Sequence, residues 1–346
     1  MNLLHVTGDS MKDILRAVAL ITLPAIGILL TCGEVLLRFG GYTPYYYDAY
    51  AYVPSQNPEI LYELRPGFRG LYAGVPISIN SQGFRGREVL IPSGNRPFRV
   101  LTIGDSITFG QGVLDDETLA EQLRARLQSL TDSLVDVVNL GVPGYNTCQE
   151  LSIYRDRGVP LAHDVVLLFY YENDTEPPIF AIDKGIVVSP DVRTGFLGEI
   201  AAWARKHVVV YNLVWTRWQV LKQQLRTGGN YLQHIADKFD EKNAGWQRSK
   251  ACLADLIALA KTQSVRVIVV PFPVVGFLSE RPYPLDRYIR TVCEAAVTRG
   301  SECFNVVPML QEPGLRPTVS SVEDHPSAQV YERIAKQVAT LLKPKI

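Results

Sequence analysis

The chain has 346 residues, enough to bury a large core in one domain or in two small ones. Lys and Arg together number 35, as do Asp and Glu, so the bulk charge gives no reason to expect a nucleic-acid partner. None of the five cysteines forms a C-x-x-C pair, which argues against a zinc site. We expect no metal and no cofactor.

An apolar segment near the N-terminus predicts a membrane anchor. Residues 17–33 read AVALITLPAIGILLTCG and carry no charge, and two basic residues precede them. Seventeen uncharged residues are at the lower limit for a bilayer span, and Glu34 lengthens the span only at a cost. The basic residues favour an N-terminus kept inside, with the tyrosine-rich residues 42–52 at the opposite interface. The alternatives are a cleaved export signal, including lipoprotein-type cleavage at Cys32, and a buried helix.

Residues 1–41 are therefore predicted to be the signal anchor or transmembrane segment. Residues 42–97 are rich in Pro, Gly and Tyr with short strand-like pieces, and we expect a linker that becomes a cap or an edge hairpin. Residues 98–346 form the main domain.

The main domain alternates strands and helices. Apolar runs predict strands, and apolar spacing of three and four predicts helices. In chain order the elements are a strand at 99–105, a helix at 118–130, a strand at 135–142, a helix at 147–158, a strand at 164–171, a helix at 246–262, a strand at 265–273, a helix at 285–299 and a last helix from about 326. Capping-box pairs are expected at Thr118 with Glu121 and at Thr147 with Glu150. This alternation predicts a parallel sheet covered on both faces.

The stretch from about 175 to 245 interrupts this rhythm and is interpreted as a helical, lid-like insertion. Its aromatic residues are expected to form a core or lid-packing face, with a ligand-stacking face as the alternative. These residues are Trp203, Tyr211, Trp215 and Trp218.

The cysteines leave the redox compartment open. A bridge between Cys293 and Cys303 fits an oxidising compartment, whereas buried free thiols fit a reducing one. We interpret Cys148 as a packing residue because no base is expected near it.

Chemically capable residues follow the predicted strands and precede the last helix. They are Gly104, Asp105 and Ser106 after the first strand, Asn139 to Gly144 after the second, Asn173 and Asp174 after the third, and Glu323, Asp324 and His325 before the last helix. Sites of open α/β sheets form at the carboxyl ends of the strands. A serine, an imidazole, an acid and oxyanion donors are what acyl transfer by a serine needs. A second Gly-Asp-Ser that ends at Ser10 follows no strand and is not expected to react.

The blocks GDSITFG, NLGVPG, END and DHPS, in this order, resemble the SGNH (GDSL-type) hydrolase family over residues 98–175 and 246–342. The resemblance implies a flavodoxin-like three-layer α/β/α sandwich with a parallel sheet. The segments GEVLLRFGGY, LYELRPGFRG and INSQGFRG resemble membrane-anchored bacterial members. That likeness implies a single-pass protein of the bacterial inner membrane whose catalytic domain faces the periplasm or the exterior.

The resemblance also assigns roles to residues. Ser106 matches the nucleophile, and its backbone N–H matches one oxyanion donor. The N–H of Gly144 and the side-chain amide of Asn173 match the other two donors, and His325 matches the general base. Asp105 is expected to brace the turn or cap the following helix.

Two positions depart from the family pattern. Tyr171 stands where block three has a glycine, which crowds the site or shapes an acyl pocket. Val322 stands three residues before the histidine, where the acid commonly lies. We therefore expect Glu323 to orient His325, with Asp324 as the alternative and a backbone carbonyl or a Ser–His dyad after it.

The implied function is that of a serine esterase that hydrolyses an O-acyl ester, with O-acetyl first, of a carbohydrate or envelope glycan through an acyl-enzyme on Ser106. The alternatives are an O-acyltransferase that modifies a polysaccharide with the same Ser/His site, a lipid esterase, and a non-catalytic envelope-binding protein. The expected partners are the acylated carbohydrate or lipid ester and the membrane.

Overall fold

The computed structural model describes residues 16, 18–42, 44, 49–91, 96–183, 186–188, 196–226, 230–320 and 323–343. The chain forms two compact units. One unit combines Met1–Tyr46 with Arg193–Gln223, and the other combines Tyr47–Val192 with Gln224–Ile346. Each unit is described by itself. The predicted limits of anchor, linker and main domain stay a prediction.

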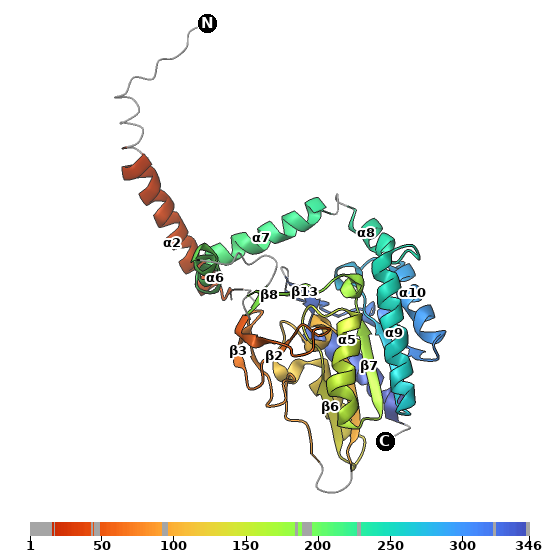
Figure 1. Ribbon diagram of the computed structural model, residues 1–346. Coiled ribbons are helices and arrows are strands. Elements are labelled where there is room, and N and C mark those ends of the chain that lie inside the picture. The colour runs from red at the N-terminus through yellow and green to blue at the C-terminus, as the bar shows by residue number, and fades with distance from the viewer. Residues whose placement is uncertain are drawn as a thin grey trace. The chain divides into compact units, whose positions relative to one another are not determined.

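The larger unit is built on a five-stranded parallel sheet (Figure 1). Its strands are β5 (Phe98–Ile103), β6 (Val135–Asn139), β7 (Val165–Tyr170), β10 (Arg266–Pro271) and β11 (Glu302–Cys303). Their order in the sheet is β11-β10-β7-β5-β6, the flavodoxin-like arrangement. The strands are nearly continuous apolar runs because both faces of the sheet are buried.

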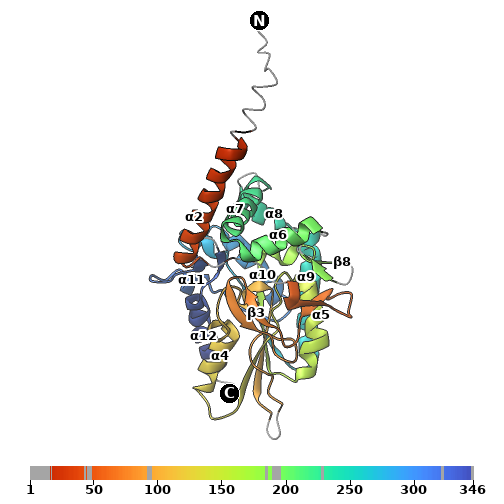
Figure 2. The same cartoon turned by 90° about the vertical axis from the view of Figure 1, so that its left-hand side faces the viewer.

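Helices cover the two faces of the sheet and complete the three layers. Helices α4 (Leu119–Gln128) and α12 (Ala328–Leu342) pack together on one side, whereas α5 (Thr147–Ile153) and α9 (Ala244–Thr262) pack together on the other (Figure 2). Helix α10 (Asp286–Val297) packs on β10 and α9. The predicted α/β/α sandwich with a parallel sheet is therefore confirmed.

Shorter elements connect these layers. They are β8 (Ala181–Asp183) paired with β9 (Ile186–Val188), β12 (Thr318–Ser320) paired with β13 (Glu323–Pro326), the helices α3 (Ser106–Phe109), α8 (Tyr231–Lys238) and α11 (Val307–Leu310), and the helical turns at Asp115–Glu117, Tyr154–Gly158, Val159–Leu161, Glu172–Thr175 and Val275–Phe277.

The segment before β5 forms two small antiparallel hairpins. They pair β1 (Tyr52–Pro54) with β2 (Tyr62–Leu64) and β3 (Arg69–Tyr72) with β4 (Val75–Ser78). We call residues 49–91 the N-terminal arm. Three tyrosines of the arm, Tyr52, Tyr62 and Tyr72, are at most 3% exposed, whereas Tyr50 is 74% exposed. Each hairpin is a two-stranded sheet of its own and adds no strand to the five-stranded sheet, and the linker and cap role of the segment stays a prediction.

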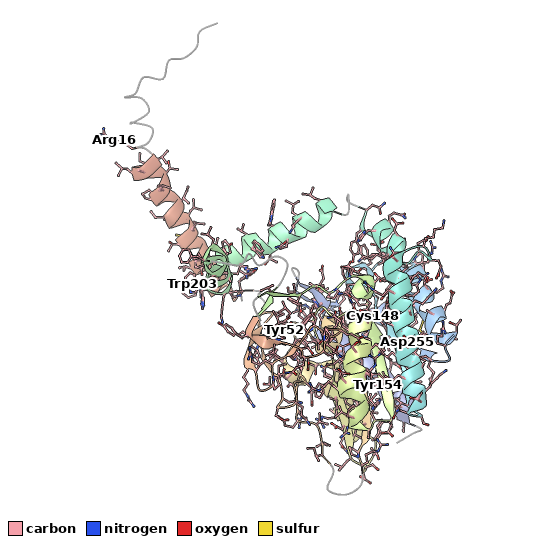
Figure 3. All side chains as sticks on the ribbon, in the orientation of Figure 1. Arg16, Tyr52, Cys148, Tyr154, Trp203 and Asp255 are labelled. Atoms are coloured by element: carbon pink, nitrogen blue, oxygen red, sulfur yellow. A yellow bond between two sulfur atoms is a disulfide. The ribbon has the colours of Figure 1, made fainter. Side chains whose placement is uncertain are left out.

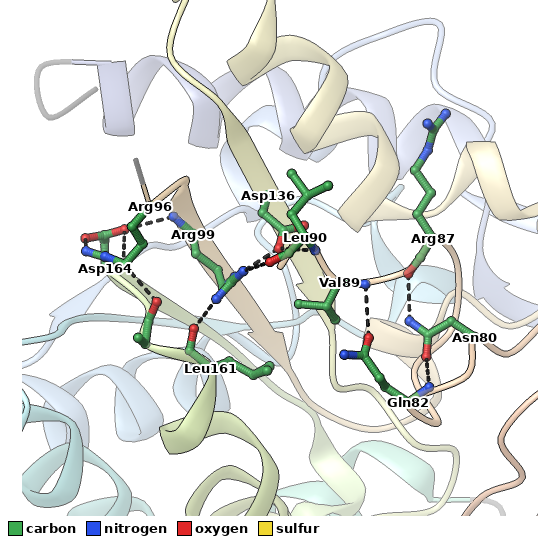
Figure 4. A network of polar contacts seen from close by, with 11 residues as sticks. Asn80, Gln82, Arg87, Val89, Leu90, Arg96, Arg99, Asp136, Leu161 and Asp164 are labelled. Carbon is green, nitrogen blue, oxygen red and sulfur yellow. Dashed lines mark hydrogen bonds and ion pairs between the residues drawn. The ribbon is translucent and has the colours of Figure 1, made fainter. Parts of the chain in front are cut away.

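A buried ion pair fastens the arm to the amino ends of the strands (Figure 4). Arg99 at the start of β5 donates to Asp136 of β6 over 2.9 Å and to the backbone oxygen of Leu90 in the arm over 2.5 Å. Asp164, just before β7, accepts the backbone N–H of Arg99 over 2.8 Å. Because paired charges satisfy one another, these groups tolerate burial at the sheet edge opposite the site described below.

The smaller unit contains α2 (Leu23–Phe39), α6 (Phe196–His207) and most of α7 (Val209–Arg226). A π-helical turn, η1 (Val18–Thr22), precedes α2. Val18–Phe39 is the one helix among the described residues that is long and apolar enough to cross a membrane, with a mean hydropathy of 2.1. A helix of this kind near the N-terminus is typical of a single membrane span or of a signal sequence.

Two expectations about helix α5 need correction. The capping box of α5 is Asn146 with Gln149 and not Thr147 with Glu150. The side chain of Asn146 accepts the backbone N–H groups of Cys148 and Gln149, so the cap lies one residue earlier than predicted. Cys148 is not a packing thiol: it forms a disulfide with Cys252 that links α5 to α9 (Figure 3).

The aromatic residues of the insertion also differ from their prediction, and one strand was not predicted. Trp203 and Trp218 are 60% and 55% exposed, whereas Tyr211 and Trp215 are half-buried, so the four aromatic residues do not form one fully buried core face. The two-residue strand β11 was missed because it is too short to show a pattern. The bridge between Cys293 and Cys303 is present.

Candidate active site

Ser106 lies at the first turn after β5, where α3 begins. Gly104 has a φ of +155°, and a Cβ on it would lie 2.1 Å from Oγ1 of Thr108, so only glycine fits there. Asp105 caps α3, because its carboxylate accepts the N–H of Ile107 over 2.8 Å. The predicted bracing role of Asp105 is therefore confirmed.

His325 reaches Ser106 from the other end of the chain. It lies on β13, directly before α12, and its Nε2 is 2.8 Å from Oγ of Ser106. Both side chains are half-buried. The distance is that of a hydrogen bond, so the imidazole is placed to take the hydroxyl proton.

The other ring nitrogen of His325 contacts a residue that the sequence did not indicate. The side-chain amide nitrogen of Gln111 lies 3.1 Å from Nδ1. Gln111 is buried and follows α3 between two glycines, Gly110 and Gly112, which both have a φ of +83°. The left-handed backbone at both glycines turns the chain so that the glutamine faces the histidine ring.

The two candidate acids are adjacent to His325 on β13. Asp324 is exposed. The side chain of Glu323 lies outside the described residues, as does Val322. The assignment of the orienting acid therefore stays a prediction.

The loop after β6 packs against the serine turn. The N–H of Val142 donates to the backbone oxygen of Gly104 over 3.1 Å. A Cβ on Gly141 would lie 2.3 Å from the backbone nitrogen of Phe109, so the loop approaches α3 as closely as glycine allows. Gly144 has a φ of +80° and lies against Tyr62 of the arm and Phe180. The structure thus brings this loop beside the turn that carries Ser106. Gly144 lies two residues after Val142, which makes the hydrogen bond to that turn.

Asn173 joins the same turn from the loop after β7. Its Nδ2 donates to Oδ2 of Asp105 over 2.9 Å. Burial raises the pKa of the Asp105 carboxyl above its ordinary value, and hydrogen bonds from Ile107 and Asn173 and the nearby His325 partly oppose this. The hydroxyl of Ser106 lies 3.4 Å from Oδ2 of Asp105, so the imidazole is its closer partner.

Two further carboxyls are buried in this region, at Glu150 on α5 and Asp174 after β7. Neither oxygen of Glu150 has a hydrogen-bond partner among the described residues. Burial raises the pKa of both groups well above their ordinary values; repulsion from Asp105 adds to this at Glu150, and repulsion from Glu150 and Asp105 adds to it at Asp174. Asp174 is buried, and its Oδ2 accepts the N–H of Tyr171 over 3.1 Å.

The N-terminal arm contributes a buried cation to the serine turn. The guanidinium of Arg85 donates to the backbone oxygens of Phe109, Gly110 and Val113 over 3.0, 2.5 and 2.6 Å. It also pairs with Asp115 over 3.0 Å. Arg85 therefore holds the C-terminal carbonyls of α3, which have no partner within the helix. Within the described residues no group of three or more His, Cys, Asp or Glu side chains is arranged to hold a metal ion.

A serine hydroxyl hydrogen-bonded to an imidazole, at the carboxyl edge of a parallel sheet and beside a side-chain amide, defines a serine hydrolase site of the SGNH type. Comparison with protein families gives the same class. The model of the GDSL-like lipase/acylhydrolase family matches residues 102–333, and the chain belongs to this family. It is an ester-hydrolysing serine hydrolase.

Solved structures similar to this chain include a lipase/acylhydrolase and an acetylxylan esterase. One is the lipase/acylhydrolase from Enterococcus faecalis, with a TM-score of 0.42 and 16% identity, covering 71% of this chain and 96% of that one. The other is a catalytic mutant of an acetylxylan esterase from Geobacillus stearothermophilus, with a TM-score of 0.43 and 16% identity, covering 72% of this chain and 94% of that one. No curated protein sequence matches the chain significantly.

Proposed function

We propose that Ser106 is the nucleophile and His325 the general base of an esterase that works through an acyl-enzyme. The observation that supports this most directly is the 2.8 Å between Oγ of Ser106 and Nε2 of His325. Oγ attacks the ester carbonyl while Nε2 takes its proton, and the same proton then goes to the departing alcohol. Water, deprotonated by His325, then attacks the acyl-enzyme. The bond between the acyl group and Oγ breaks, the proton returns to Oγ of Ser106, and the carboxylic acid departs.

The negative charge on the tetrahedral oxygen falls to three donors in this proposal: the N–H groups of Ser106 and Gly144 and the amide of Asn173. An amide nitrogen carries two hydrogens, and Asp105 accepts one from Asn173. That bond fixes the orientation of the amide, and the second hydrogen remains for the oxyanion. Loss of one such donor costs about 10²- to 10³-fold in turnover.

Glu323 is our first choice as the acid that orients His325, and Asp324 is the second. An exposed carboxylate such as that of Asp324 holds an imidazole less firmly, because water competes for it. The triad is defined by geometry and not by spacing, so the shorter spacing to the histidine is no obstacle.

The proposed substrate is the O-acetyl ester of a carbohydrate or envelope glycan, with lipid esters second. Two partly exposed aromatic rings, Tyr231 and Phe277, lie on the side of the site that carries β13. Tyr231 stacks on Phe277 with ring centroids 5.9 Å apart, and the turn at Val275–Phe277 packs against β13. Flat aromatic faces suit the C–H faces of a sugar ring.

The proposed location is the outer side of a bacterial inner membrane, with Val18–Phe39 as the single span. Two disulfides support this location, because disulfides persist in oxidising compartments and are rare in the cytosol.

The test is active-site labelling with a fluorophosphonate and hydrolysis of p-nitrophenyl acetate and an acetylated xylan. Ser106→Ala and His325→Ala should abolish turnover, and Ser106→Ala should also abolish labelling. Asn173→Ala should lower turnover by about 10²-fold with labelling retained. Glu323→Gln should cost more than Asp324→Asn, and the reverse order would move the acid to Asp324. A wild-type chain that neither labels nor hydrolyses these esters would contradict the proposal.

A further inference from the structure

Helices α6 and α7 each present an exposed apolar stripe. On α6 the stripe is Phe196, Ile200 and Trp203, and on α7 it is Val214, Trp218, Leu221 and Leu225. Both sets follow the i, i+4, i+7 spacing of one helix face. Each stripe contains a tryptophan that is more than half exposed, at 60% for Trp203 and 55% for Trp218. Exposed apolar faces of this kind are typical of surfaces that bind another protein or a membrane.

The remaining faces of the two helices are used inside the smaller unit. The amide of Asn212 donates to the backbone oxygen of Arg205 over 3.0 Å, and the guanidinium of Arg205 lies 5.0 Å from the centre of the Trp215 ring. Val209 and Asn212 are buried. The packing faces of the helices are therefore satisfied, and the apolar stripes are additional to them.

The charge of the two helices favours an anionic partner. Among the side chains that the structure describes on these helices, four basic residues stand against one acid, Glu199: they are Arg205, Lys206, Arg217 and Lys222. A helix pair with tryptophan and aliphatic residues on one side and Lys and Arg elsewhere is typical of segments that lie in the plane of a membrane interface. Tryptophan favours the same depth.

The joint between α6 and α7 is fastened to the apolar helix α2. The carboxylate of Glu34 accepts the first backbone N–H groups of α7, from Val209 over 3.0 Å and from Val210 over 2.9 Å. Arg38 donates over 2.7 Å to the backbone oxygen of His207, the last residue of α6. Gly33 also lies beside the joint, since a Cβ on it would be in ordinary contact with Cγ2 of Val210, at 3.4 Å. The two charges near the end of the apolar helix thus satisfy the helix ends of α6 and α7.

These positions place the joint at a membrane interface. Val18–Phe39 is 22 residues long, about 33 Å at 1.5 Å per residue, against about 30 Å of hydrocarbon. Glu34 is five residues before Phe39, about 8 Å from the end of the helix. We propose that α6 and α7 lie on the outer surface of the bilayer that α2 spans, with their apolar stripes in the lipid and their basic residues toward anionic headgroups.

This inference rests on the proposed membrane anchoring, and the experiment separates the two. The full chain is reconstituted in phosphatidylcholine vesicles with about 30 mol% phosphatidylglycerol. Variants that keep one tryptophan, with the others replaced by Phe, report contact with brominated acyl chains by fluorescence quenching. Trp246, which is buried in the larger unit, is the internal control. Resistance to alkaline carbonate extraction reports the anchor alone.

We expect bromolipid to lower the emission of Trp203 and of Trp218 about twofold and to leave Trp246 unchanged. Glu34→Gln should reduce this quenching while the chain still resists extraction, whereas Glu199→Gln, an exposed acid away from the joint, should not. Carbonate-resistant chain whose Trp203 and Trp218 are quenched no more than Trp246 overturns the inference and leaves the anchor standing. That result also follows if a second copy of the chain covers the stripes. Extraction by carbonate overturns the anchor and the inference together, and fluorophosphonate labelling shows whether the hydrolase site is intact.

Discussion

At the scale of single residues, the unexpected contact is that of Gln111 with Nδ1 of His325. A histidine that takes a proton at Nε2 becomes positively charged and needs an acceptor at Nδ1. In the tautomer that acts as the base, Nδ1 carries the ring hydrogen, so Gln111 supports the ring with its amide turned to present the oxygen as the acceptor. Gln111 is therefore a positioning residue for His325.

We predict that Gln111→Ala lowers kcat/KM about tenfold, because the ring loses one of its supports. Gln111→Glu should retain much of the activity but move the acidic limb of the pH–rate profile to higher pH, because a carboxylate favours the charged imidazole. The measurement is kcat/KM for p-nitrophenyl acetate between pH 5 and 9, with Gln263→Ala, an exposed position after α9, as the control. An unmoved profile for Gln111→Glu would assign Gln111 to packing only.

The sequence identified Ser106 and His325 because short blocks around them have a fixed order and composition. It did not identify Gln111, because its contact depends on two left-handed glycines, Gly110 and Gly112, that turn one side chain toward a strand more than 200 residues away. A side chain's neighbours across the fold leave no local pattern in the chain.

At the scale of elements, the N-terminal arm supports the serine turn through Arg85. Its guanidinium donates to three backbone carbonyls at the end of α3 and just beyond it, two of which otherwise have only one long hydrogen bond, of 3.4 Å from Asn139 to Phe109 and of 3.3 Å from Val113 to Gly110. The sequence block INSQGFRG was notable only as part of a resemblance, and the structure shows what its arginine does.

Arg85→Met should lower the free energy of unfolding by about 2–4 kcal/mol, since the carbonyls and Asp115 lose their partner. It should also slow fluorophosphonate labelling of Ser106, because the turn is less firmly held. The control is Arg87→Met in the same arm. Arg87 is 70% exposed and pairs with Glu121 at the surface, so its loss should change stability by about 0.5 kcal/mol or less. Equal losses in the two variants, measured by urea unfolding, would contradict the role of Arg85.

Helix α5 shows how a shift of one residue at a cap changes the chemistry of an element. Because Asn146 and not Thr147 caps the helix, Glu150 does not fold back on the cap and is instead buried, with no hydrogen-bond partner in the part of the chain that the structure describes. Burial raises the pKa of its carboxyl well above the ordinary 4.5, and Asp105 adds repulsion. The folded chain then holds a proton that the unfolded chain has released.

Stability should therefore fall as the pH rises from about 4.5 toward the raised pKa of Glu150, by up to about 1.4 kcal/mol per pH unit for one proton. Glu150→Gln should flatten this slope, leaving the part that belongs to Asp174, whose pKa burial also raises. The measurement is urea unfolding between pH 4.5 and 9, with the exposed Glu294→Gln as the control. A wild-type stability that rises with pH over this window is the contrary result.

At the scale of the whole molecule, the sequence predicted the sheet and its covering helices but not the smaller unit. Strands such as β5 and β7 are visible because both faces of the sheet are buried, which demands unbroken apolar runs. The pairing of α2 with the joint of α6 and α7 was not predictable, because Glu34 meets Val209 across 175 residues of chain. The bridge between Cys148 and Cys252 was not predictable for the same reason, because the two cysteines are 104 residues apart.

The two disulfides give a last prediction, on both location and stability. The full chain exported by a bacterial host should show one free thiol, that of Cys32, against five after reduction. Chain-entropy arguments assign about 4.7 kcal/mol to a bridge that spans 104 residues and about 2.7 kcal/mol to one that spans 10. Replacing Cys148 and Cys252 together by Ser should therefore destabilise the protein more than replacing Cys293 and Cys303, when urea unfolding of the exported chains is compared without reductant. Equal losses would show that restriction of the unfolded chain is not what these bridges contribute, and five free thiols in the exported chain would remove the support that they give to an oxidising location.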